Sequence, residues 1–197
     1  MIKIFGDPIS GNCLKVKWTC ERLGIPFTWT NVDVTKSETR TEAFLAMNPS
    51  GQVPTVLLQD GRPLAQSNAI LLHLAEGSDL IPSDSYERAR MLEWLFWEQY
   101  SHEPYVAVAR FQMKYLGKAR GELDPKIIER GEAALQRLER ALAGADFLAG
   151  ARLSLADISL VAYTRMAHDG GFDLAHYPAV SAWVARVEAA LPIQDPR

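Results

Sequence analysis

Two short segments carry the residues best suited to binding a small ligand, residues 48–57 and residues 66–70. Pro54 heads a β-branched, apolar run, and proline, which cannot donate to a strand ladder, belongs at the first residue or edge of a strand. A cis Val53–Pro54 bond, which costs an X-Pro pair only about 0.5–1 kcal/mol, would turn the N–H and C=O of Val53 outward. Extended backbone exposed beside a helix start at Ser67 suits a small peptide, because a peptide strand pairs with the backbone and the helix start takes a carboxylate.

Ser10 and Cys13 stand where a first strand gives way to a helix. A serine at such a position often caps the helix, which is one interpretation of Ser10. The run Ser10-Gly11-Asn12-Cys13 is also a C-x-x-C redox loop with serine in place of the first thiol. Cys13 could therefore have a lowered pKa and form a mixed disulfide. The favoured interpretation of Cys13 is a small, buried and inert side chain.

The composition indicates a globular chain without a nucleic-acid or membrane partner. Of 197 residues, 48% are apolar and 23% are charged, and the net charge is −3. The first residues lack the pattern of a signal peptide, and no apolar run approaches the roughly 20 residues of a membrane span. Cys13 and Cys20 would lie about 10 Å apart on one helix, too far for a disulfide, so a reducing cytoplasmic compartment fits best.

The first part of the chain alternates strand and helix in the order β-α-β-α-β-β-α, which predicts a small mixed four-stranded sheet with helices packed on it. Alternating or β-branched runs predict the strands, and Ser67 is expected to cap the third helix. The expected strands are Ile2–Phe5, Pro26–Val32, Thr55–Leu58 and a short one near Pro63–Leu64, and the expected helices are Asn12–Leu23, Glu42–Met47 and Asn68–Glu76.

The rest of the chain reads as all helical, so we expect domains over residues 1–77 and 86–197, joined by a polar linker at 78–85. The first of these helices is long and aromatic, with a bend expected near Pro104. A capping box of Ser154 and Asp157, with aspartate in place of glutamate, starts the third. The expected helices are Tyr86–Leu116, Pro125–Ala143 after N-cap Asp124, Leu155–Ala167 and Pro178–Ala190.

Taken together, these motifs resemble the cytosolic glutathione S-transferases, and in particular their serine-type delta, theta and phi classes. The resemblance rests on motifs that occur in order along nearly the whole chain: residues 8–12 after the first strand, Asn48-Pro49 through Val53-Pro54, Gln66-Ser67, and residues 147–150 running into 154–157. It implies a thioredoxin-like N-terminal domain, an all-α C-terminal domain, a homodimer and a glutathione site between the domains. It also implies glutathione as co-substrate, with no other cofactor and no metal.

The resemblance assigns roles around the sulfur of glutathione. Ser10 would donate a hydrogen bond that favours the thiolate, and Asn12 is a second donor that could share or take over this task. The cysteine-type classes carry their reactive thiol at or next to the Ser10 position, and not at Cys13. A plain helix cap remains the alternative role of Ser10.

The resemblance also places the rest of the tripeptide. The backbone of Val53 would pair with the cysteinyl part, next to Pro54 and Gln52. Ser67 would hold the γ-glutamyl carboxylate, and Gln66, an amide where many members carry an acid, would contact the amino group. Arg40, Lys36 and Gln52 are candidates for contacts with the glycine end, where a basic residue fits the carboxylate, although a solvated charge describes Arg40 or Lys36 as well.

The implied reaction is attack of the glutathione thiolate on a small hydrophobic electrophile. The pocket for this second substrate would include Ile9, Tyr105, Ala109 and Met113, although most residues in such a stripe are simply core. A glutathione-dependent peroxidase or disulfide reductase on the same fold is an alternative, as is a non-catalytic binding or assembly module. Asp157 is expected to support folding and not chemistry.

Overall fold

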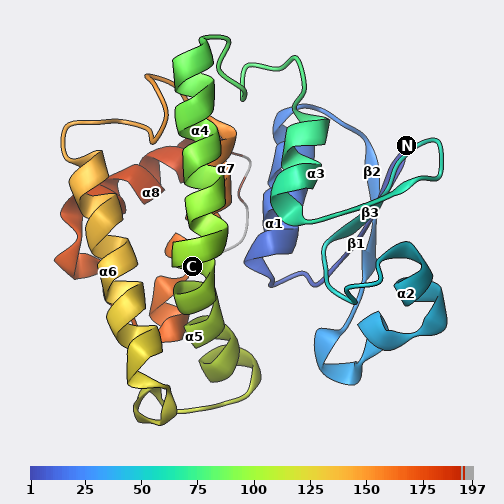
Figure 1. Cartoon of the computed structure of the whole chain (residues 1–197), viewed down its shortest axis with the longest axis horizontal. Coiled ribbons are helices and arrows are strands. Elements are labelled where there is room, and N and C mark those ends of the chain that lie inside the picture. The colour runs from blue at the N-terminus through green and yellow to red at the C-terminus, as the bar shows by residue number, and fades with distance from the viewer. Residues whose placement is uncertain (192, 194–197) are drawn as a thin grey trace. The chain divides into compact units, whose positions relative to one another are not determined.

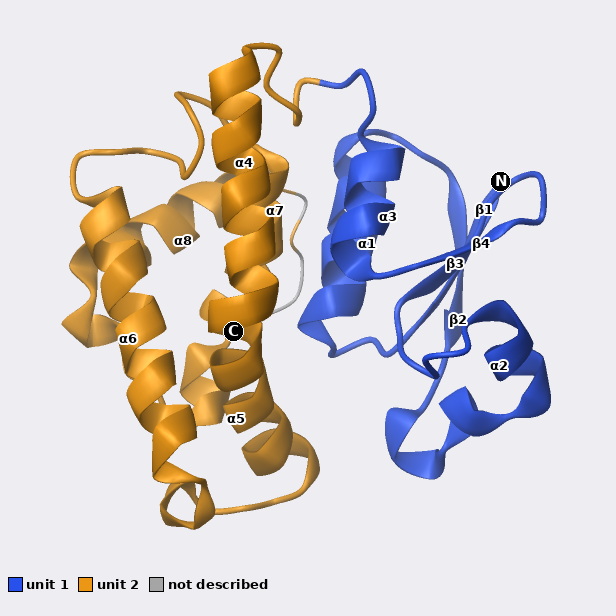
Figure 2. Cartoon of the chain, viewed as in Figure 1, with its two compact units in different colours: residues 1–78 blue, residues 79–197 orange. Residues whose placement is uncertain are grey.

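The computed structural model describes residues 1–191 and 193, and the chain divides into two compact units, Met1–Ser78 and Asp79–Arg197 (Figure 2). Every strand of the described residues belongs to the first unit, whereas the second unit is helical. No helix in the described part of the chain is both long and apolar enough to cross a membrane.

The first unit is built on a four-stranded mixed sheet with the strand order β2-β1-β3-β4 (Figure 1). The two central strands run antiparallel to each other, β2 runs parallel to β1, and β4 runs antiparallel to β3. This confirms the predicted β-α-β-α-β-β-α order. The strands are β1 (Ile2–Gly6), β2 (Phe27–Asn31), β3 (Thr55–Leu57) and β4 (Pro63–Ala65).

Helices cover both faces of this sheet. Helices α1 (Gly11–Arg22) and α3 (Ser67–Leu74) pack side by side on one face, and α2 (Glu42–Met47) lies on the other (Figure 1). Because side chains alternate along a strand, Phe5 of β1 points to the face opposite the buried Ile4 and meets Phe44 of α2 edge-on, with ring centroids 6.5 Å apart.

The strand register gathers three loops at one end of the sheet. Phe5 of β1 is paired with Thr55 of β3, and Thr55 is paired in turn with Ala65 of β4. The chain that leaves β1 toward Ser10, the loop that enters β3 through Val53, and the chain that leaves β4 into α3 therefore lie at the same end. These are the loops that carry most of the candidate glutathione-binding residues.

The start of α3 differs from the expectation. Ser67 is the first residue of the helix, and Gln66 occupies the N-cap position with φ 69° and ψ 111°, so the prediction that Ser67 is the cap is wrong. The helix also ends at Leu74, earlier than Glu76. As a first-turn residue, Ser67 contributes its own N–H to the group of helix donors that have no partner within the helix.

The second unit begins with α4 (Ser85–Trp97), and the helical path then continues through Pro104 to Tyr115. The path changes to π-helical turns over Glu98–Ala107 and Phe111–Tyr115, on either side of α5 (Val108–Arg110). Proline has no N–H to donate to the preceding turn, so a regular α-helical ladder through this segment is not possible. The sequence predicted the long helix but not the wide turns.

Three further helices complete this unit, α6 (Pro125–Leu142), α7 (Leu155–Thr164) and α8 (Pro178–Ala190). All ten residues of α7 are buried, which makes it the central helix of the unit. Helix α7 ends three residues before the predicted Ala167, and Asp124 caps α6 as predicted by accepting the N–H of Lys126. Single 3₁₀ turns occupy Val34–Lys36, Glu38–Arg40, Arg120–Glu122, Ala167–Gly170 and Leu174–His176.

Candidate active site

Ser10 is held by a turn that closes on Asp7. The N–H of Ser10 donates to the carbonyl of Asp7 at 3.2 Å, and the N–H of Ile9 donates to the Asp7 carboxylate at 2.9 Å. Ser10 occupies the N-cap position of α1, but its hydroxyl makes no hydrogen bond to the helix backbone. The hydroxyl instead hydrogen-bonds with the Cys13 thiol, so the simple capping role is not what its side chain does.

The side chain of Asn12 links the first turns of α1 and α3. Its Oδ1 accepts a hydrogen bond from Lys15 Nζ at 2.7 Å and another from Ser67 Oγ at 3.0 Å. Lys15 is completely buried and Ser67 nearly so, whereas Asn12 is partly exposed. The structure thus joins two candidate residues that lie 55 positions apart in the sequence.

The loop before β3 presents the backbone of Val53. The Val53–Pro54 bond is cis, as the sequence suggested. Asn48 fixes the loop, since its Nδ2 donates to the carbonyl of Gln52 at 2.8 Å and to Thr55 Oγ1 at 3.1 Å. No hydrogen bond within residues 1–191 and 193 engages the N–H or C=O of Val53, so both groups are available to an added strand.

The two basic candidates are placed differently. Arg40 leans over the same loop, with Nη1 3.4 Å from the carbonyl of Ser50. Gly51, at φ +59°, leaves room for it, because a Cβ there would lie 2.5 Å from Arg40 Nη1. Lys36 forms an exposed ion pair with Asp33 at 3.0 Å, and its side chain is 75% exposed. The side chain of Gln52 is also exposed.

Gln66 has an unusual backbone conformation at the start of α3. Its φ of 69° places a residue with a side chain in a region that favours glycine, and such strain costs about 1–3 kcal/mol. The side chain is exposed and makes no cap hydrogen bond. Backbone strain of this kind concentrates where a fold must aim a residue at a ligand.

Both cysteines are free thiols buried in the unit. Burial raises the pKa of Cys13 to about 12, against the opposing effects of hydrogen bonds with the Ser10 side chain and the Asp7 backbone. Burial likewise raises the pKa of Cys20 to about 12. Thiols with raised pKa values are poor nucleophiles, which supports the packing interpretation of Cys13 over a redox role.

The four candidates for the electrophile pocket fall on both units. Ile9 of the first unit is 45% exposed, and Tyr105 and Met113 of the second are partly exposed. Ala109 is fully buried and packs against Gly170, so it offers no surface to a ligand. The pocket itself stays a prediction for Ile9, Tyr105 and Met113.

Asp157 is the centre of a saturated network in the second unit. Its Oδ1 accepts from the N–H of Leu148 and from Trp183 Nε1, and its Oδ2 accepts from the N–H and hydroxyl of Ser154, each at 2.9 Å. Burial raises the pKa of this carboxyl, and these hydrogen bonds oppose the rise. The predicted capping box is present, and every oxygen of Asp157 is engaged within the unit.

Sequence reasoning missed the buried Lys15, which donates to the candidate residue Asn12. A signal was available, because Lys15 follows Asn12 by three positions and therefore lies on the same helix face. Among the described residues, no cluster of three or more histidine, cysteine or acidic side chains could hold a metal ion.

Comparison with known proteins places both units in one family. Residues 9–76 match the family model "Glutathione S-transferase, N-terminal domain", and residues 99–190 match "Glutathione S-transferase, C-terminal domain". Mouse glutathione S-transferase theta-1 is 31% identical over 97% of this chain and 84% of its own length. The Escherichia coli disulfide-bond oxidoreductase YfcG is 30% identical over 96% of this chain and 91% of its own.

A solved structure agrees with these matches. The glutathione S-transferase from Pseudomonas fluorescens superposes with a TM-score of 0.92 at 48% identity, covering 95% of this chain and 94% of that one. The family models cover most of the described residues, and the thioredoxin-like sheet with its helical partner unit is the architecture that the matched structure shares. This chain therefore belongs to the glutathione S-transferase family.

Proposed function

We propose that this glutathione transferase binds the tripeptide across the three loops at one end of its sheet and stabilises the thiolate for attack on a small hydrophobic electrophile. The observation that carries this proposal is the backbone of Val53, which is unengaged within the described residues and lies at the same sheet end as the opening turns of α1 and α3. An extended tripeptide can add to Val53 as a short strand, with backbone hydrogen bonds supplying affinity.

Two positively polarised helix starts flank this strand position. Helix α3 begins at Ser67, so its first N–H groups can take the γ-glutamyl carboxylate, with Gln66 beside them for the amino group. Arg40, over the loop at Gly51, is the candidate for the glycine carboxylate. Lys36 is the weaker candidate, because its ammonium already pairs with Asp33.

The thiolate would lie at the opening turn of α1. Ser10 has a hydroxyl that the helix backbone does not use, and Asn12 has an amide in the same turn. Hydrogen bonds to a thiolate favour the charged form, and each unit by which they lower its pKa corresponds to about 1.4 kcal/mol. Both residues act as donors to glutathione and not as nucleophiles.

The test is a binding experiment followed by a comparison of substrates. Calorimetry should detect glutathione binding to the wild-type chain, and turnover should follow with an aryl halide. Absence of binding at millimolar glutathione would refute the proposal. Binding without turnover of an aryl halide, cumene hydroperoxide or hydroxyethyl disulfide would indicate a binding module.

A disulfide reductase is the second candidate, favoured by the match to the E. coli disulfide-bond oxidoreductase. In this reaction the bound glutathione thiolate would attack one sulfur of a disulfide, forming a mixed disulfide and releasing the other sulfur as a thiol. The chain's own Cys13 is too deeply buried to take part. Faster turnover of hydroxyethyl disulfide than of the aryl halide, retained in Cys13→Ser, would favour this function.

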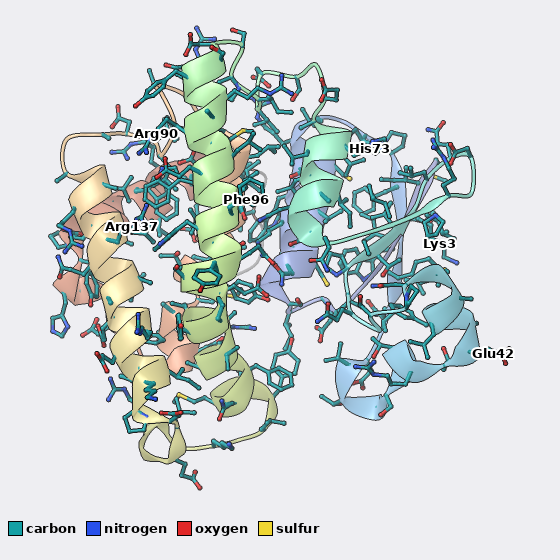
Figure 3. The ribbon with its side chains drawn as sticks, viewed as in Figure 1. Lys3, Glu42, His73, Arg90, Phe96 and Arg137 are labelled. Atoms are coloured by element: carbon teal, nitrogen blue, oxygen red, sulfur yellow. The ribbon has the colours of Figure 1, made fainter. Side chains whose placement is uncertain are left out.

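A homodimer in the cytoplasm completes the proposal. Two large aromatic side chains on consecutive turns of this helical path are mostly exposed in the single chain, Phe96 of α4 at 73% (Figure 3) and Tyr100 of the following π-helical stretch at 84%. Exposed aromatic groups on neighbouring turns indicate a protein interaction surface, and a second copy of this chain is the proposed partner. Sedimentation of the wild type and of Phe96→Ser tests this, with a shift to monomer expected for the variant.

A further inference from the structure

Lys15 is a charged residue in a place where charge is costly. Its side chain is completely buried in α1, although lysine is almost never fully buried without a partner. Its ammonium donates to Asn12 Oδ1 at 2.7 Å. The neighbouring Lys17 shows the usual arrangement instead, since its side chain is 34% exposed and its ammonium lies 4.0 Å from Glu21.

The chemistry of these partners fixes the orientation of Asn12. An ammonium group can only donate hydrogen bonds, so the side of the Asn12 amide that faces Lys15 must be the carbonyl oxygen. The hydroxyl of Ser67, also on Oδ1, can donate or accept and would tolerate either orientation of the amide. Lys15 is therefore the group that decides which way the Asn12 amide points.

A fixed carbonyl implies a fixed amino group. Because Oδ1 accepts from Lys15 and Ser67, the amino group of Asn12 lies on the other edge of the carboxamide from these two donors. Asn12 is partly exposed, and it lies two residues after Ser10 in the turn that is proposed to face the sulfur. A thiolate needs hydrogen-bond donors, and the opposite orientation of the amide would offer it an acceptor.

We propose that Lys15 is a positioning residue that turns the Asn12 amide so that its N–H groups face the sulfur of bound glutathione. The proposal rests on the proposed glutathione site. It adds to that site the group that decides whether the donor or the acceptor side of the Asn12 amide faces the sulfur. Lys15 acts through Asn12, not by contact with glutathione.

The test compares Lys15→Met with Lys17→Met, since both variants remove one positive charge from α1. Methionine keeps the length of the lysine stem, and circular dichroism verifies folding. The readout is the pKa of the bound glutathione thiol, followed by the ultraviolet absorbance of its thiolate. Lys15→Met should raise this pKa by about one unit. At a pH below the wild-type pKa it should therefore lower the thiolate fraction, and with it kcat, about tenfold, whereas Lys17→Met should change neither the pKa nor kcat. Equal effects of the two variants would overturn the proposal.

A double-mutant cycle separates orientation from charge. In an Asn12→Ala background there is no amide to orient, so Lys15→Met should no longer shift the pKa of the bound thiol. A shift of the same size in that background would overturn the proposal, because Lys15 would then act by its charge alone. Calorimetry on the wild type distinguishes failure of the proposed function from failure of the role of Lys15. A wild type that binds no glutathione refutes the proposed function itself. A wild type that binds glutathione, with no coupling between Lys15→Met and Asn12→Ala in the thiol pKa, refutes only the role of Lys15.

A crystal structure of the wild type with glutathione needs no variant and applies even if Lys15→Met does not fold. The Asn12 amide nitrogen should lie within hydrogen-bonding distance of the sulfur, while Oδ1 stays on Lys15 Nζ. An Asn12 side chain that has left Lys15, or a sulfur out of its reach, would overturn the proposal.

Discussion

Serines at the starts of helices have different hydrogen-bond partners in the two units. In the second unit, the N–H and hydroxyl of Ser154 both donate to Asp157, and both residues are buried. In the first unit, Ser10 precedes α1 without capping it, and Ser67 opens α3 while its hydroxyl donates to Asn12, a residue of another helix. The same residue type thus closes a network in one unit and makes no side-chain cap at the start of α1 in the other.

The difference shows how a fold separates stability from binding. The carboxylate of Asp157 has all its hydrogen bonds inside the unit, so replacing it affects folding. In the first unit, the buried Lys15 and Ser67 donate to the partly exposed Asn12, and no hydrogen bond within the described residues engages the backbone N–H or C=O of Val53. Saturated polar networks hold the scaffold, and incompletely used polar groups at its surface are where a ligand can bind.

The largest effect should come from breaking the saturated network. In Asp157→Asn, an amide N–H₂ replaces one of the two carboxylate oxygens. It would face the donor of Ser154 in one orientation and the donors of Leu148 and Trp183 in the other, so at least one buried hydrogen bond would be replaced by two donors that face each other. We expect a loss of about 3 kcal/mol or more in the free energy of unfolding, measured by urea denaturation.

Asp124→Asn is the matched control for this change. Asp124 is an exposed N-cap, and asparagine caps a helix as well as aspartate does, so the loss should be well below about 1 kcal/mol. Similar losses of unfolding free energy in the two variants would mean that the network around Asp157 stabilises the protein no more than an ordinary exposed helix cap does.

A pair of serine substitutions tests the comparison directly. Ser10→Ala should lower kcat/KM about 10²-fold by removing a donor to the thiolate, with a small loss of stability because no cap is lost and only the hydrogen bond with the Cys13 thiol is broken. Ser154→Ala should lower the free energy of unfolding by about 1–2 kcal/mol and leave kcat/KM unchanged. Activity that survives Ser10→Ala and collapses in Asn12→Ala would move the main donor to Asn12.

The strained start of α3 offers a smaller effect in both stability and binding. Gln66→Gly should raise the free energy of unfolding by about 1 kcal/mol, since glycine adopts positive φ without strain, and should raise the KM for glutathione. Ser37, at φ 61°, is the other residue with a side chain that has positive φ in the described chain. Ser37→Gly should also stabilise the protein but leave KM unchanged, and an equal rise of KM in both would remove the assigned role of Gln66.

The effect that is smallest near neutral pH concerns Cys13, a buried and hydrogen-bonded thiol within the binding unit. Burial raises its pKa to about 12 from an ordinary 9.0, so above pH 9 the unfolded chain loses this proton while the folded chain keeps it. The stability contributed by the neutral thiol is present in full below pH 9 and is lost as the pH rises toward 12. Cys13→Ala should make this decline shallower in urea unfolding, without abolishing it, because Cys20 behaves alike.

The thiol should also be unreactive in the folded chain. Disulfide reagents at pH 8 should label Cys13 only on unfolding, and Cys13→Ser should keep glutathione turnover. Rapid labelling of native Cys13, or loss of turnover in that variant, would restore the redox interpretation.

The sequence by itself determined the features that depend on neighbouring residues. Interactions between residues about four positions apart or fewer determine these features, so the local sequence pattern identifies them. They are the strands and helices of both units, the cap at Asp124 and the capping box at Ser154. The wrong assignment of Ser67 as a cap came from the same local reasoning. Helix-start residues were expected to bond their own helix, whereas the hydroxyl of Ser67 bonds Asn12.

Only the tertiary structure decided which residues of different segments contact or hydrogen-bond each other. It placed Lys15 in the interior behind Asn12, brought Arg40 over Gly51, and added Leu148 and Trp183 to the carboxylate of Asp157. Each of these arrangements, apart from the short link between Lys15 and Asn12, joins residues that are distant along the chain, and burial is itself a property of the packed fold. The physical reason is that hydrogen-bond donors and acceptors have no preference among distant partners until packing removes water and leaves one partner within reach.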